Sequence, residues 1–432
     1  MEQAKLNDFL DQAQQLETAN EFENAAEHYQ TIIDNTSPNS KDKKIEEIRL
    51  KALERITDLY TYYVSERYEE GLALAELYQE EATSYHDQRN ALSRIGAYAM
   101  HFGDNKRALS AYRTALELVE AHDDERGLIR AYSDLAWAYN SVGNLEEAAH
   151  YYLQAIELHN QGSGSLFGAA NIWNRLGLVY HQQGEISKAI DAHERYLKYY
   201  QEVQPEDVQS NMTALNNLGE GYLMAYDYQT AHHFFQRGLA LATEGQYLAV
   251  NADLYRNQGV AYLYEGKYDA ALENLYRALQ LSQESTNASI IVQTLYSLAL
   301  AEFAANQDEK AFEHAQNLLR MAGSNRANTH YANAIHLVGM YYQKSGDTQT
   351  AEKYWQEATY LAHESKQRSL LWQLHANLAE IATTPDLTQV HLKIAANILD
   401  QIMEGFEDPI LQNTFKRAKP VHAVLSQVKR GD

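Results

Sequence analysis

Residues 257–279 read NQGVAYLYEGKYDAALENLYRAL, and small residues stand in this stretch at fixed distances from one another. Counted from Gly259, an aromatic residue follows after three positions, Gly266 after seven, Ala271 after twelve and Ala278 after nineteen. Small residues at regular positions let two helix backbones approach closely. The spacing therefore predicts a hairpin of two packed helices.

The same frame recurs along almost the whole chain. Most copies begin with a small anchor residue equivalent to Gly259 and carry a second small residue about twelve positions later. The ten anchor positions are 13, 57, 96, 136, 177, 219, 259, 299, 339 and 379. Most intervals are 40 residues or close to it. A fixed period of this size indicates a solenoid of stacked repeats.

Elementary packing explains the frame. Gly259 and Ala271 lack bulk, and a larger residue at either position would overpack the contact at a cost of roughly 1–3 kcal/mol. Gly266 is expected to end the first helix, because a left-handed C-terminal residue is least strained when it is glycine. Asp269 suits the start of the second helix, where its charge favours the positive end of the helix dipole. Each repeat is thus predicted to be helix–turn–helix.

The composition supports an all-α protein. The chain has 432 residues, of which 45% are hydrophobic, and only 5 are proline. No strand-like alternation of apolar and polar residues stands out. We expect an array of about ten repeats over residues 1–408. A capping helix and a frayed tail are expected over residues 409–432, since solenoid ends require cover.

Charge and cysteine content exclude several classes of function. The formal net charge is -23, which opposes general binding to nucleic acid or anionic membranes and favours partners with basic segments. The chain has no cysteine, so disulfides, thiolate catalysis and Cys-ligated zinc are excluded. No signal peptide and no apolar run of about 20 residues is present, so a cytoplasmic protein is expected.

Enzyme and metal motifs are absent from the sequence. The chain lacks GxxxxGK[ST], HExxH, GxSxG and GxGxxG, so we expect no catalytic residues and no cofactor. His232 and His233 are adjacent and would point in different directions on a helix, so no metal site is expected. The 32 tyrosines are expected to pack rather than to stack on bases, because six share one position of the frame. These are Tyr60, Tyr139, Tyr180, Tyr222, Tyr262 and Tyr342.

The small residue, the aromatic residue, the turn glycine and the two alanines resemble the tetratricopeptide repeat, whose shortest form has 34 residues. The resemblance covers roughly residues 5–405, and the longer period here is similar to the branch with LGN/Pins scaffolds, kinesin light chain, MalT-type sensor domains and bacterial peptide-sensing regulators. It implies a right-handed superhelix that binds a peptide or a partner domain in its concave groove. The alternative implied function is a sensor that binds a small peptide and switches a separate effector.

In this repeat class the first helix of each hairpin forms the concave face, and positions two and three before the anchor, and one and four after it, point inward. The groove residues inferred on this basis are Trp137, Asn174, Arg175, Asn216, Asn217, Glu220, Arg256, Asn257 and Leu263. Asn offers both a donor and an acceptor to a peptide backbone, and Arg can bind carboxylates through two N–H groups. In LGN and kinesin light chain, Asn and Arg residues of this row hold the bound peptide, and LNNLG at 215–219 resembles the kinesin light chain version.

Several alternatives stay open at this point. The polar row can simply hydrate a concave surface, and Trp137 can be buried between helices instead of lining a groove. Nothing in the residues requires an enzyme such as a phosphatase. Self-association into a homodimer is a further alternative, because repeat arrays offer end helices for it.

Overall fold

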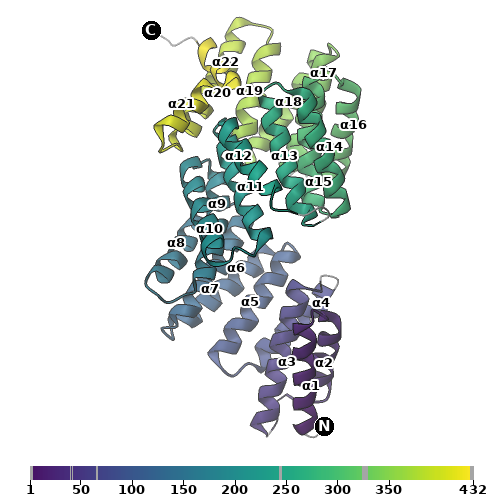
Figure 1. The fold of residues 1–432 in the computed structure, drawn as a ribbon, viewed down its shortest axis with the longest axis vertical. Helices are drawn as coiled ribbons and strands as arrows, with labels where there is room; N and C mark the ends of the chain where they lie inside the picture. Colours follow the sequence, from purple (N-terminus) through teal and green to yellow (C-terminus); the bar gives the residue numbers. More distant parts are fainter. Residues whose placement is uncertain are drawn as a thin grey trace. The chain divides into compact units, whose positions relative to one another are not determined.

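The computed structural model describes residues 3–38, 40, 42–64, 67–242, 246–323 and 329–428, without the side chain of Thr329. Over these residues the secondary structure is helical and no strand is present (Figure 1). The four residues at the C-terminus, for which a frayed tail is expected, lie outside the described residues. The described part of the chain therefore has the all-α fold predicted from the repeats.

The chain divides into two compact units, residues 1–172 and 173–432. Unit 1 contains α1 (Gln3–Thr18), α2 (Phe22–Asp34), α3 (Lys43–Tyr62), α4 (Tyr68–Glu81), α5 (Tyr85–His101), α6 (Asn105–Glu120), α7 (Glu125–Ser141) and α8 (Leu145–Asn160). The boundary lies within α9 (Leu166–Gln183).

Unit 2 continues with α10 (Ile186–Val203), α11 (Val208–Met224), α12 (Tyr228–Leu239), α13 (Leu248–Tyr264), α14 (Tyr268–Glu284), α15 (Ala288–Ala304), α16 (Asp308–Ala322), α17 (Thr329–Lys344), α18 (Thr348–Glu364), α19 (Arg368–Ile381), α20 (Pro385–Glu404), α21 (Pro409–Arg417) and α22 (Lys419–Gln427). The division predicted from the sequence, into a repeat array up to residue 408 and a C-terminal segment after it, concerns repeat pattern rather than compact units. It stays a prediction.

Each odd-numbered helix from α1 to α19 packs against the helix that follows it, which makes the ten predicted hairpins. The anchor glycines are the points of closest approach. A Cβ atom on Gly219 would collide with the ring of Phe235, and one on Gly339 would collide with Trp355. Both large residues are completely buried and stand sixteen positions after their anchor. The alanine twelve positions after the anchor, such as Ala271, is also completely buried.

The repeated tyrosines pack within their own hairpins. Tyr222 stacks on Phe234 at 5.5 Å between ring centroids, and Tyr342 stacks on Tyr354 at 5.7 Å. In both cases the partner lies twelve residues further on, in the second helix. Tyr60 is buried. The packing role predicted for this position is confirmed.

The turns between paired helices use left-handed backbone. Gly266 has φ of 79° and Gly346 has φ of 87°, as expected for glycines that end a helix. Three turns have another residue at the equivalent position: Asn20 with φ of 61°, and Tyr226 and Asn306, both with φ of 59°. Asn tolerates this conformation, whereas a bulky residue there stores strain.

The C-terminal segment forms two short helices, α21 and α22, where the sequence led us to expect one. Pro420 explains the break, because it lacks an N–H group and its ring would collide with the carbonyl of residue 416 in a continuous helix. Ala418 between the two helices is extended, with ψ of 135°. Both helices pack on α20, the last helix of the array.

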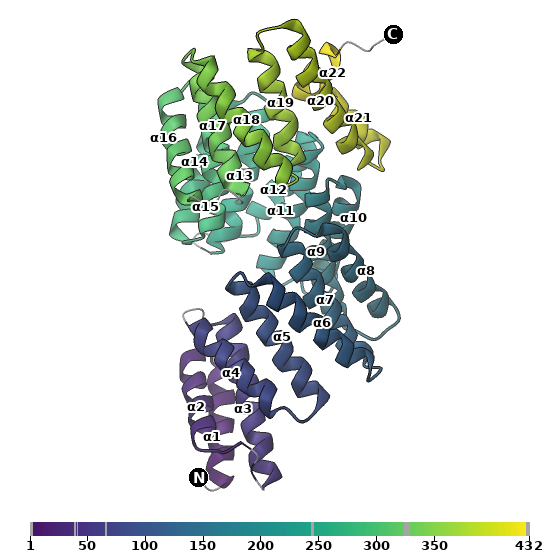
Figure 2. The ribbon, with the colours of Figure 1, turned by 180° about the vertical axis from the view of Figure 1, so that it is seen from behind.

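The segment between α20 and α21 also contacts the first hairpin of unit 2. The Oγ of Ser187 accepts hydrogen bonds from the backbone N–H groups of Glu407 at 2.9 Å and Asp408 at 3.3 Å. Gly405 lies so close to the carbonyl of Gly184 that no side chain would fit. We call this contact the seam, and α21 lies beside α10 in both ribbon views (Figures 1 and 2). Unit 2 therefore closes on itself.

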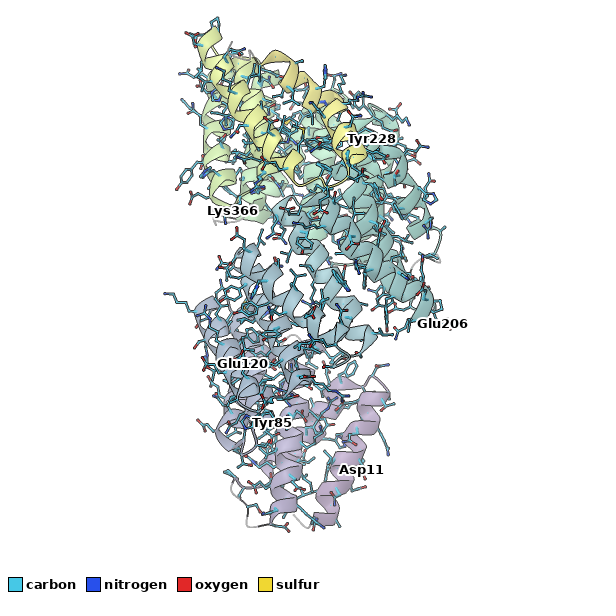
Figure 3. All side chains as sticks on the ribbon, turned by 90° about the vertical axis from the view of Figure 1, so that its left-hand side faces the viewer. Asp11, Tyr85, Glu120, Glu206, Tyr228 and Lys366 are labelled. Atoms are coloured by element: carbon cyan, nitrogen blue, oxygen red, sulfur yellow. The ribbon has the colours of Figure 1, made fainter. Side chains whose placement is uncertain are left out.

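An aromatic cluster next to the seam accounts for the unusual turn at Tyr226. The ring of Tyr226 lies 5.5 Å from Phe415 in α21 and 5.5 Å from Tyr264 at the end of α13. Tyr228, labelled in Figure 3, is 6.0 Å away, and Phe406 packs on Phe415 at 5.3 Å. The ring contacts of Tyr226 offset the strain of its backbone.

Two of these non-glycine turns, at Tyr226 and Asn306, provide a matched test of the cluster. We expect Tyr226→Gly to lower the free energy of unfolding by about 2 kcal/mol, because the lost ring packing exceeds the relieved strain. It should also speed hydrogen exchange in residues 403–415. Asn306→Gly should change stability by less than about 0.5 kcal/mol and leave that exchange unchanged, since Asn306 has φ of 59° but no ring. Equal effects of the two substitutions would show that the cluster does not hold the seam.

Candidate functional site

The first helices of unit 2 line its inner face. α11, α13, α15 and α17 contact one another in sequence, and the second helices make no comparable contact within the described residues. Because the helices are closer on this side, the stack curves toward it. The concave surface expected from the sequence therefore lies on the first helices.

The predicted asparagines of this face bond to one another. Asn217 donates from Nδ2 to Oδ1 of Asn174 at 2.8 Å, and Asn257 donates from Nδ2 to Oδ1 of Asn216 at 3.0 Å. In each pair a residue two before its anchor bonds to a residue three before the preceding anchor. We call this arrangement the polar ladder.

The ladder recurs with other residue types. Nδ2 of Asn377 lies 3.0 Å from Nε2 of His336 in the preceding repeat. In unit 1, Ser93 donates to Asp134 of the following repeat. Asn216, Asn217 and Asn257 are all buried, with exposed fractions of 6%, 6% and 1%. Since buried polar groups need partners, the ladder joins successive first helices by satisfying these amides.

The predicted arginine of α13 is paired within its own helix. Nη2 of Arg256 lies 3.1 Å from Oδ1 of Asp253, and only 12% of the arginine side chain is exposed. Burial raises the pKa of Asp253, an effect that Arg256 opposes and Glu220 reinforces. A ligand carboxylate would have to compete with Asp253 for the guanidinium.

A second polar cluster lies further along the inner face. The hydroxyl of Tyr296 lies 3.1 Å from Nδ1 of His336, whose other ring nitrogen contacts Asn377. Burial lowers the pKa of His336 to about 4. Burial also raises the pKa of Tyr264, although 37% of that residue is exposed. The ring of Tyr264 is therefore in part open to solvent.

The structure brings together most of the predicted groove residues. Those that lie on α9, α11 and α13 of unit 2 are Asn174, Arg175, Asn216, Asn217, Glu220, Arg256, Asn257 and Leu263. Arg175 is exposed, and Glu220 and Leu263 are partly exposed. Trp137 lies on α7 of unit 1, where it is partly exposed. Their role in binding stays a prediction.

Two features of the site were not predicted. The pairing of Arg256 with Asp253 follows an i, i+3 spacing that the sequence displays. Tyr264 was missed because it stands five positions after its anchor, outside the positions expected to point inward. The aromatic cluster nearby was also missed, although Tyr226 stands where most repeats have glycine and could have indicated it.

In the part of the chain that the structure describes, no group of three or more His, Asp or Glu side chains is arranged to hold a metal ion. None of the helices that the structure describes is both long enough and apolar enough to cross a bilayer.

The buried histidines make stability depend on pH. His336 is neutral in the folded protein down to about pH 4, whereas an unfolded histidine takes up a proton near pH 6.5. The unfolded state therefore binds more protons between these values, and stability falls as the pH falls from about 6.5 to 4. The loss for His336 alone is at most about 3 kcal/mol.

Urea unfolding at several pH values would measure this effect. His336→Gln should flatten the pH dependence, while His363→Gln, a change at an exposed histidine, should not. Some slope will remain, because burial also lowers the pKa of His193 and His375. An unchanged slope in His336→Gln would contradict the assignment.

Comparison with known proteins gives the repeat type. Family models described as tetratricopeptide repeat match residues 87–161, 168–244 and 252–285. No curated protein has a sequence significantly similar to the chain.

Solved structures show the same fold at low sequence identity. The apo form of the quorum sensor NprR from B. thuringiensis is 15% identical, with a TM-score of 0.59 over 82% of this chain and 99% of that one. A Rap protein complexed with Competence and Sporulation Factor is 16% identical, with a TM-score of 0.57 over 84% and 99%. A signal-transduction ATPase with a tetratricopeptide repeat sensor, from Pyrococcus horikoshii, is 16% identical, with a TM-score of 0.54 over 82% and 55%.

Proposed function

Because the chain is built from tetratricopeptide repeats of the longer type, we propose that it is a non-catalytic scaffold that binds a peptide or a partner domain on the inner face of unit 2. The observation that carries the proposal is that this face combines a buried polar layer with partly exposed side chains. A buried polar ladder holds the first helices at a constant spacing, and partly exposed side chains such as Glu220 and Leu263 lie on the same helices. Repeat arrays use such extended concave surfaces for binding.

The chemistry of the face suggests the kind of ligand. Leu263 and Tyr264 offer apolar area, while Glu220 offers a carboxylate. The net charge of -23 adds attraction for basic segments of a partner. We also propose the cytoplasmic location that is expected from the sequence. Light scattering would measure whether the chain forms a homodimer.

Peptides selected from a random displayed library on the wild-type protein would test the scaffold. The combined Glu220→Gln and Leu263→Ala variant should bind them about tenfold more weakly, because it removes one charge and one apolar contact from the inner face. These positions are better tests than the asparagines, whose loss would leave ladder partners unpaired.

The matched control is the combined Tyr360→Ala and Glu364→Gln variant on α18, a second helix, where Tyr360 is 65% exposed. It should keep the wild-type affinity. Equal affinity of the inner-face variant and the wild type for all selected peptides would refute the proposal.

The seam favours a second candidate function, a peptide sensor that signals through a change in unit 2. The seam includes three hydrogen bonds of Ser187: two that its Oγ accepts, and one that its backbone N–H donates to the carbonyl of Gly405 at 3.4 Å. Arg368 of α19 adds a bond to the carbonyl of Gln183 at 3.3 Å. Unit 2 would then have two states, one with the seam formed and one with it broken. A ligand on the inner face that binds one state more tightly would shift the balance between them. The quorum sensor NprR has a similar fold, which agrees with this alternative.

A disulfide across the seam would separate the two functions. The chain has no cysteine, so the pair Ser187→Cys and Glu407→Cys would form only the intended bridge. A sensor should bind selected peptides with an affinity that differs at least fivefold between the oxidised and reduced variant, because the bridge removes one of two states. A plain scaffold should bind them equally in both forms.

A further inference from the structure

The C-terminal segment has a charge opposite to that of the rest of the chain. Residues 409–432 contain five Lys and Arg residues and a single Asp, a net charge of +4, whereas the whole chain carries -23. Three of the five basic residues, Lys416, Arg417 and Lys419, lie in the described region. All three are exposed, and none forms an ion pair with another described residue.

The α21 helix separates a buried face from an exposed one. Leu411 and Phe415 are buried, and Phe415 anchors the helix to Tyr226. Ile410 and Arg417, two turns apart on the opposite side, are exposed. Ile410 is 75% exposed, more than any other large hydrophobic residue in the described part of the chain. An exposed apolar residue thus stands at one end of the helix and a basic group at the other.

Helix stability accounts for only part of this arrangement. Lys416 and Arg417 lie in the last turn of α21, where positive charge favours the negative end of the helix dipole. Lys419, however, is the first residue of α22, where a positive charge is unfavourable. The exposed Ile410 likewise contributes little to the fold.

We propose that the outward face of α21, together with Lys419, is a docking surface for a short acidic segment of a partner protein. An apolar side chain of the segment packs on Ile410, and its carboxylates pair with Lys416, Arg417 and Lys419. The surface does not include the inner face of unit 2, so this inference is independent of the proposed scaffold function.

Electrostatic screening limits the partner to a short segment. The Debye length is about 8 Å at physiological ionic strength, so carboxylates bound at the C-terminal end of α21 feel the basic cluster more than acidic groups further away. The exposed Glu407 and Asp408 precede the N-terminal end of the helix, so the carboxylates of the segment are placed at the other end. A DNA duplex or an anionic bilayer extends much further and would meet the negative remainder of the chain. A helix of 9 residues is about 14 Å long, which an extended segment of roughly four to six residues matches.

Binding of a fluorescently labelled acidic peptide of about six residues, made of Asp and Glu with one Leu, would test the inference. The full chain should bind the peptide, and affinity should fall as salt is raised. The combined Lys416→Gln, Arg417→Gln and Lys419→Gln variant should lose about tenfold in affinity. Ile410→Ser should also weaken binding, whereas the salt dependence should stay as in the wild type.

A variant with equal loss of charge serves as the matched control. Lys106→Gln, Arg126→Gln and Lys198→Gln also replace two lysines and one arginine, all of them exposed, and should leave affinity unchanged. Circular dichroism would verify that both triple variants remain helical. No binding by the wild type at low salt, or equal weakening in both triple variants, would overturn the proposal. Tighter binding to duplex DNA or to anionic phospholipid vesicles than to the peptide would overturn the choice of a protein partner.

Discussion

The close approach of two helices at a small anchor residue is the contact on which the rest of the fold depends. Gly219 and Gly339 leave space that Phe235 and Trp355 fill completely. Because the large residue enters the space that a Cβ would need, each hairpin has one register. Within each unit, repeating this contact at a period near 40 residues stacks the hairpins and places the first helices on the same side.

The second constraint is the need of buried amides for partners. First helices that approach closely bury the residues just before each anchor, and an unpaired amide there would be costly. The pairs Asn217–Asn174 and Asn257–Asn216 satisfy this need between neighbouring repeats. The same residues that resemble a peptide-binding row therefore also hold the inner face together. Recognition by this face is proposed to rest on their partly exposed neighbours.

The C-terminal segment of unit 2 contacts the first hairpin of that unit, and it carries a positive charge in an otherwise acidic chain. Tyr226 adopts a strained backbone and contributes its ring to the contact with Phe415, while Ser187 accepts two backbone bonds from the segment before α21. The contact orients α21, so that Ile410 and Arg417 face outward. A segment that looks like a simple end cap in the sequence thus also provides a defined basic surface.

The sequence by itself determined the all-α class, the ten hairpins, the anchors and the stacking role of the repeated tyrosines. These features depend on contacts within one repeat or between neighbours, which a local period records. Only the tertiary structure decided that the asparagines bond to one another, that Asp253 occupies Arg256, and that residues 405–408 meet Ser187. The repeat period brings the asparagines into neighbouring positions, and an i, i+3 spacing does the same for Asp253 and Arg256. Which partner each buried group takes depends on how deeply its side chain is buried, and the contact with Ser187 joins residues about 220 positions apart; no spacing in the sequence encodes burial or that contact.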